Sequence, residues 1–209
     1  MKHLSKTLAA AGLTALLSSA ALAAQVERVR GTIDKAEGST LTIKTDDGKS
    51  EMVDVGGAKF AWVVPSNLDA IKDGVFIGTA TKGENPMTAL EVVLFPESMR
   101  GTGEGHYGWD TITDQTADAG AKVKSAMTNG TVKADKAASG GERTLTVSYG
   151  KDGSKEIVVP SSAPIVAFEP ADKAILSPGS KVFAVVAKDG AKAEGKLVAV
   201  GKDGLTPPM

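Results

Sequence analysis

The chain of 209 residues has no cysteine and few aromatic residues. Without a thiol it cannot form a disulfide, bind a metal through thiolate, use a cysteine nucleophile or carry a lipid on cysteine. Its aromatic residues are five Phe, two Trp and two Tyr. The core must therefore be built mainly from Val, Ile, Leu and Ala, and its stability must come from aliphatic packing.

The sequence also lacks an excess of charge of either sign. The sequence has 24 Lys and Arg against 25 Asp and Glu, a formal net charge of −1, and the two signs are interspersed. Proteins that bind nucleic acids usually carry a basic patch or stripe that neutralises phosphates. We therefore expect no nucleic-acid partner.

The longest apolar stretch stands at the N-terminus. Lys2 and Lys6 precede the stretch Leu8–Leu22, and Ala21-Leu22-Ala23 fits a small-residue cleavage pattern. This order predicts a secretory signal peptide over residues 1–23. A membrane span needs about 20 strongly apolar residues, more than this broken stretch offers. We expect a periplasmic or secreted protein with no stable membrane insertion after signal removal.

The rest of the sequence contains an internal repeat, which relates residues 31–95 to residues 130–200. The corresponding segments are Gly31-Thr32-Ile33 with Gly130-Thr131-Val132, Thr40-Leu41-Thr42-Ile43 with Thr144-Leu145-Thr146-Val147, Asp47-Gly48 with Asp152-Gly153, and residues 58–65 with 163–170. Repeats of this kind determine architecture. They predict a first domain over 24–96, a second over 128–209 and an inter-domain loop or connector over 97–127.

Within each repeat the pattern is typical of strands and tight turns. Leu41 and Ile43 alternate with polar residues, as on a half-buried strand. Asp47-Gly48 follows, a pair that favours hairpin turns, and Leu145 and Val147 precede Asp152-Gly153 in the same way. We therefore predict an all-β protein made of two tandem small five-stranded barrels of the OB type.

The order of these marks resembles the small OB-like domains of uncharacterised exported bacterial proteins. The marks are Gly-Thr-Ile or Gly-Thr-Val, Leu-Thr, Asp-Gly, and a Gly turn before a strand. The resemblance covers both repeats and implies a fold and a compartment. It implies no activity.

The unusual residues lie between the repeats, in the sequence PESMRGTGEGHYGWD of residues 96–110. One interpretation is a metal site, with copper or zinc as the cofactor, held by imidazole, carboxylate and thioether. Its candidate ligands are Met99, Glu104, His106 and Asp110. A small organic ligand would instead use Arg100, Tyr107 and Trp109.

Two other interpretations of this segment remain open. Tyr107 and Trp109 could pack between the two barrels, because aromatic anchors bury large areas, or they could recognise a protein or glycan partner. An enzyme is not expected, because no serine lies in a nucleophile elbow and the glycines do not match a phosphate-binding loop. The sequence thus predicts an exported non-enzymatic binding protein, with a structural or protein-interaction module as the alternative.

Overall fold

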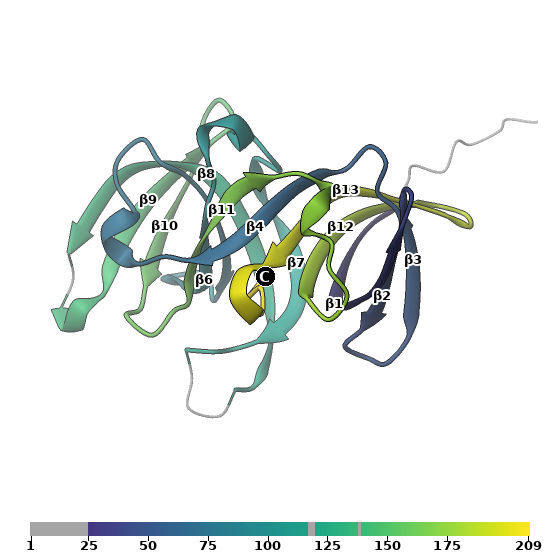
Figure 1. Cartoon of the computed structure of the whole chain (residues 1–209). Coiled ribbons are helices and arrows are strands. Elements are labelled where there is room, and N and C mark those ends of the chain that lie inside the picture. The colour runs from purple at the N-terminus through teal and green to yellow at the C-terminus, as the bar shows by residue number, and fades with distance from the viewer. Residues whose placement is uncertain (1–24, 117–119, 138) are drawn as a thin grey trace, which may run out of the picture.

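The computed structural model of the chain describes residues 25–116, 120–137 and 139–209 (Figure 1). The predicted signal peptide, residues 1–23, lies outside the described part. The described residues form an all-β protein, as predicted, whose helical segments are short 3-10 turns. Its strands are β1 (Gln25–Glu37), β2 (Thr40–Thr45), β3 (Ser50–Asp54), β4 (Lys59–Pro65), β5 (Phe76–Lys82), β6 (Met87–Leu94), β7 (Gly105–Thr113), β8 (Lys122–Ala137), β9 (Arg143–Tyr149), β10 (Gly153–Val159), β11 (Ile165–Ala171), β12 (Lys181–Asp189) and β13 (Lys192–Gly201).

Both predicted hairpins are present. The turn between β2 and β3 contains Gly48, whose φ of 83° suits glycine. In the second repeat the positive φ, 56°, belongs to Gly150, while Gly153 lies within β10. A Cβ on Gly153 would come within 2.2 Å of the Tyr149 ring, so this glycine leaves space for an aromatic side chain instead of forming the turn.

The repeated Gly-Thr pair has a packing role that is the same in both repeats. A Cβ on Gly31 would lie 2.1 Å from the carbonyl oxygen of Lys44, and a Cβ on Gly130 would lie 2.4 Å from that of Ser148. The first strand of each repeat therefore passes so close to its neighbour that only glycine fits.

The strands form one mixed sheet of 13 strands, in place of the two separate five-stranded barrels that the sequence predicted. The pairing path closes at both of its ends. At one end β3 pairs with β13, which completes ring A from β1, β2, β3, β12 and β13. At the other end β10 pairs with β6, which completes ring B from β5, β6, β8, β9 and β10.

Each ring contains strands of both repeats. β1 of the first repeat pairs with β12 of the second, and β8 of the second repeat pairs with β5 of the first. β4 carries the chain from ring A to ring B and pairs antiparallel with β11, which carries it back (Figure 1). The seven extended residues of β4 span about 23 Å. Strand pairing therefore does not follow the predicted division into residues 24–96 and 128–209.

Four hydrophobic clusters fill this architecture, and the smallest of them (Ala80, Leu90, Ile112 and Met127) packs against Tyr107 and Trp109. The first lies on strands of ring A and includes Ile33, Leu41, Ile43, Val53 and Val198. The second lies on strands of ring B and includes Ile77, Val92, Leu145, Val147 and Ile157. The third joins the rings through the central strands and includes Val63, Val93, Val166, Phe168, Phe183 and Met209.

Residues 97–127, predicted as a loop or connector, contain β7 and the beginning of β8, which pair antiparallel. The Ala-rich part of this segment has no apolar helical face, and backbone pairing between β7 and β8 keeps the residues of these two strands extended. Among the described residues no helix is long and apolar enough to cross a bilayer.

Candidate functional site

A cavity of about 630 Å³ is lined by strands of both rings and by β7. In Figure 1 the C-terminal residues and β7 lie between the two rings, where the lining strands meet. Most of the lining is aromatic or aliphatic and includes Val93, Phe95, Phe168, Phe183, Leu197 and Met209. A partly apolar concave site between two structural units is a common place for a small-molecule site.

β7 supplies two aromatic side chains to this cavity, Tyr107 and Trp109. They stand two residues apart on a strand and so project to the same side, with ring centroids 6.1 Å apart. The Tyr107 hydroxyl donates to the carbonyl oxygen of Gly103 at 3.1 Å. Burial raises the pKa of the Tyr107 phenol, an effect that the positive charge of Arg28 partly opposes.

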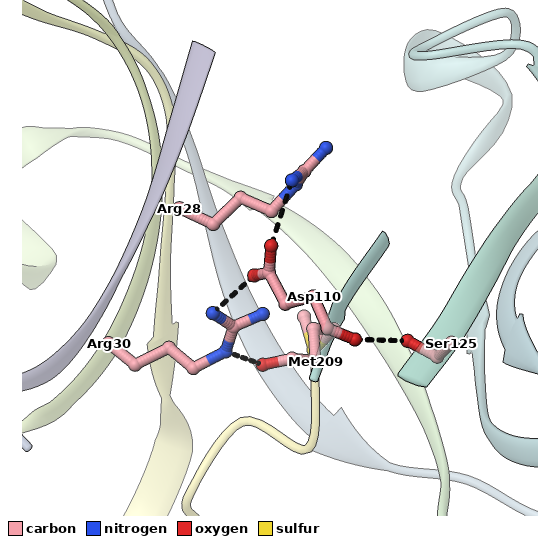
Figure 2. A network of polar contacts seen from close by, with 5 residues as sticks. All are labelled: Arg28, Arg30, Asp110, Ser125 and Met209. Carbon is pink, nitrogen blue, oxygen red and sulfur yellow. Dashed lines mark hydrogen bonds and ion pairs between the residues drawn. The ribbon is translucent and has the colours of Figure 1, made fainter. Parts of the chain in front are cut away.

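A polar network fixes the end of β7 against ring A (Figure 2). The Asp110 carboxylate accepts hydrogen bonds from Arg28 at 2.9 Å and from Arg30 at 2.7 Å. The backbone oxygen of Asp110 accepts a hydrogen bond from the Ser125 hydroxyl at 2.7 Å, and Arg30 Nε donates to the backbone oxygen of Met209. One aspartate thus links β7 to β1 and to β8.

Several buried polar atoms at the cavity have no hydrogen-bond partner in the described part of the chain. They are Trp109 Nε1, Asn129 Oδ1 and Arg28 Nε, which all belong to side chains of the lining. Buried polar groups are nearly always paired in proteins, and exceptions concentrate at functional sites. Asn129 is held in place because its amide donates to the carbonyl oxygen of Thr102 at 3.0 Å.

Two of the predicted metal ligands, His106 and Glu104, form hydrogen bonds with residues outside the cavity. His106 Nδ1 shares a hydrogen bond of 2.9 Å with Thr128 Oγ1, and the imidazole stacks on the Tyr149 ring. Burial, helped by the positive charge of Lys155, lowers the pKa of His106. Glu104 accepts a hydrogen bond from the backbone N–H of Gly150 at 2.9 Å.

The other two predicted ligands, Met99 and Asp110, also contact other parts of the protein. Met99 is buried in the third hydrophobic cluster, and Asp110 is paired with two arginines. In the described ranges no three His, Asp or Glu side chains form a group that could hold a metal ion. The structure thus does not assemble Met99, Glu104, His106 and Asp110 into one site that could hold copper or zinc.

Of the three predicted ligand-binding residues, the structure places two in the cavity. Tyr107 and Trp109 line it, whereas Arg100 does not. Arg100 pairs with Glu97 at 2.6 Å and donates to the backbone oxygen of Gly74 at 2.9 Å. Its contacts hold the 3-10 turn before β7 against the start of β5.

The sequence reasoning missed the basic residues that line the cavity: Arg28, Lys59 and Lys196. One signal was available in β1, where Arg28 and Arg30 flank the buried Val29. This alternation places two cations on one strand face opposite the core. No comparable pattern marks the two lysines, because their relation depends on which strands become neighbours.

Comparison of the chain with protein-family models, with curated proteins and with solved structures finds no match. The resemblance to exported OB-like domains therefore stays a prediction. The cavity and the residues that surround it are the basis for any assignment of function.

Proposed function

We propose that this protein is a non-enzymatic binding protein that holds a small, largely apolar ligand in the cavity between rings A and B. The cavity itself carries the proposal. Its volume of about 630 Å³ falls within the range of roughly 300 to 1,000 Å³ found for small-molecule sites. Its mainly apolar lining would stabilise a ligand by removing apolar surface from water, at about 25 cal/mol per Å².

Rigid walls support the same proposal. Phe168, Phe183 and Val93 are nearly fully buried parts of the third cluster, so their positions are set by core packing. Tyr107 is held by its pairing with Met127 on β8, and Trp109 lies against the guanidinium of Arg28, which Asp110 binds. A cavity whose walls are ordered before binding loses little conformational entropy when a ligand enters.

A neutral apolar dye tests the proposal. N-phenyl-1-naphthylamine should bind with saturation and gain emission as it leaves water. Val185 lines the cavity, and Val185→Trp should fill part of it and weaken dye binding by about tenfold, equivalent to roughly 1.4 kcal/mol.

The matched control is Val158→Trp, because Val158 is also half-buried on a strand but does not line the cavity. It should leave dye binding unchanged. The absence of saturable emission, or an equal loss in both variants, would contradict the proposal.

A second candidate function is structural, and a specific observation favours it. Asp110 ties β7 to both Arg28 and Arg30, while Trp109 lies 6.4 Å from Phe183 between ring centroids. β7 would then serve to fasten the two rings together. Removal of Asp110 would lower stability under either function, so the distinguishing result is that the cavity would take up no dye.

Two further proposals concern the setting of the site. We infer that each ring acts as a small OB-like unit, which its five strands and closed pairing support. We also propose that the protein is exported, with the signal over residues 1–23 removed. N-terminal sequencing of the protein recovered from a periplasmic fraction tests this, and a mature chain that retains residues 1–23 would contradict it.

A further inference from the structure

The ionisable side chains of the cavity lining are all basic apart from the Tyr107 phenol. They are Arg28, Lys59 and Lys196, and no Asp or Glu of the described residues contributes to the lining. The overall sequence is close to neutral, so this local excess of positive charge is not a property of the chain as a whole. It indicates that the site favours a negative group.

Strand register places these cations relative to the apolar lining. Arg28 pairs with Val185, Val185 with Leu197, and Leu197 with Lys59 on four adjacent strands. Directly paired residues project to the same face of a sheet. One row across the sheet therefore has a cation at each end, about 14 Å apart from the spacing of strands, with two aliphatic residues between them.

The cavity has an exposed end and a buried end. Val26 is 57% exposed, and Lys59 and Lys196 are also exposed. One step deeper along β1 and β12, Arg30 pairs with Phe183, which is only 3% exposed. The two lysines thus stand at the mouth, and the aromatic lining lies further inside.

The charges at the mouth differ in how fully they are already paired. Arg28 is bound to Asp110. Lys196 contacts Glu194 at 2.9 Å, but both side chains are more than half exposed and the pair is weak. Lys59 forms no ion pair within the described part of the chain. Lys59 and Lys196 are therefore the cations available to a ligand.

We propose that the ligand is an amphiphile with one acidic head group, whose apolar part occupies the cavity and whose head group lies between Lys59 and Lys196. The inference rests on the proposed function and names its ligand class. Lysine suits this position, because its long apolar stem covers the tail while the ammonium stays in water beside the acid.

Three ligands of equal chain length test the proposal: dodecanoate, dodecanol and dodecylamine. Each is used at about pH 8, below its micelle concentration or, for dodecanol, below its solubility limit, to displace N-phenyl-1-naphthylamine from the intact mature protein. Dodecanoate should bind about five- to tenfold more tightly than dodecanol, since two exposed cations each contribute modestly, and dodecylamine should bind most weakly. The preference should shrink as salt is raised, because the charges are exposed.

The double variant Lys59→Gln/Lys196→Gln should bind dodecanoate and dodecanol equally, with dodecanol affinity unchanged. Lys192→Gln is the matched control, because Lys192 is exposed on β13 outside the lining and should leave the preference intact. If all three ligands bind equally to the wild-type protein, the head-group inference fails while the proposed function stands. If none of the ligands or the dye binds, the proposed function fails with it.

Discussion

The guanidinium carbon of Arg28 lies 3.7 Å from the centroid of the Trp109 ring. The same guanidinium donates to Asp110, so Trp109 and Asp110 on β7 both bind one cation on β1. A cation over an indole face contributes about 0.5 to 2 kcal/mol, depending on how far it is removed from water. This contact joins the cavity wall to the polar network and makes β7 part of the interface between the rings.

Removal of the Asp110 carboxylate should destabilise the protein. Asp110→Ala leaves Arg28 and Arg30, with side chains 18% and 26% exposed, without their shared anion. We expect a loss of about 2 kcal/mol in the free energy of unfolding, below the value for a fully buried pair because water still reaches the site. Urea denaturation measures it. Glu37→Ala, which removes the exposed pair with Lys35, is the control and should cause no measurable change; an equal effect in both variants would contradict the role of the network.

Two substitutions of Trp109 should distinguish the contribution of ring packing to stability from that of the indole N–H. Trp109→Ala removes a ring that packs on Phe183 and Tyr107 and should cost on the order of 3 kcal/mol. Trp109→Phe keeps an aromatic ring but removes Nε1, which is buried without a partner in the described structure. Since loss of an unsatisfied donor can be neutral or favourable, this variant should cost much less. Thermal unfolding of both proteins compares them, and equal losses would show that the indole N–H matters more than packing.

The sequence predicted local structure better than strand partners. Asp47-Gly48 and the alternation of Leu41 and Ile43 depend on neighbouring residues, so the first hairpin was found where it occurs. The exchange of strands between the repeats, by which each ring contains strands of both, was not predictable in this way. β5 and β12 are equivalent strands of similar sequence, and β1 could pair with either. The repeat itself makes the alternatives nearly equal, and in the structure β1 pairs with β12.

The sequence predicted some residues of the candidate site but not how their side chains are arranged. Tyr107, Trp109 and Asp110 were singled out because they are rare or chargeable residues between the repeats, and they lie at the cavity or beside it. The metal interpretation treated their segment as a loop, in which all side chains could converge. On a strand, alternation sends His106 to Thr128 and away from Tyr107 and Trp109.

Glu91 should make stability fall as pH rises. Its side chain is 1% exposed, Oε1 accepts from the backbone N–H of Ala80 at 3.1 Å, and Oε2 is buried with no partner in the described chain. Burial raises the pKa of Glu91 from 4.5 to about 8, against the opposing effects of the Ala80 N–H and the positive charge of Arg30. Between these values the unfolded chain has released a proton that the folded chain keeps, so unfolding becomes easier with increasing pH.

Glu91→Gln removes this titration. The variant should match the wild-type protein near pH 4 and become more stable by several kcal/mol near pH 8, at about 1.4 kcal/mol for each pKa unit. Denaturation in urea at a series of pH values measures the difference. A gap between the two proteins that stays constant from pH 4 to pH 8 would show that Glu91 does not titrate differently in the folded and unfolded states.

Separation of the chain between β7 and β8 should test the exchange of strands. A fragment of residues 24–116 contains β1, β2 and β3 of ring A but only β5 and β6 of ring B. A fragment of residues 120–209 contains the complementary strands of both rings. Neither fragment can complete a ring by itself, and an incomplete sheet exposes unpaired edges.

We therefore expect the two fragments, produced together with a tag on one of them, to purify as a 1:1 complex that unfolds cooperatively like the uncut chain. Each fragment alone should be unfolded or should pair with a second copy of itself through the same strands, as size-exclusion chromatography with light scattering will measure. Two independently folded monomeric fragments are the outcome expected for barrels contiguous in sequence, and that result would contradict the exchange.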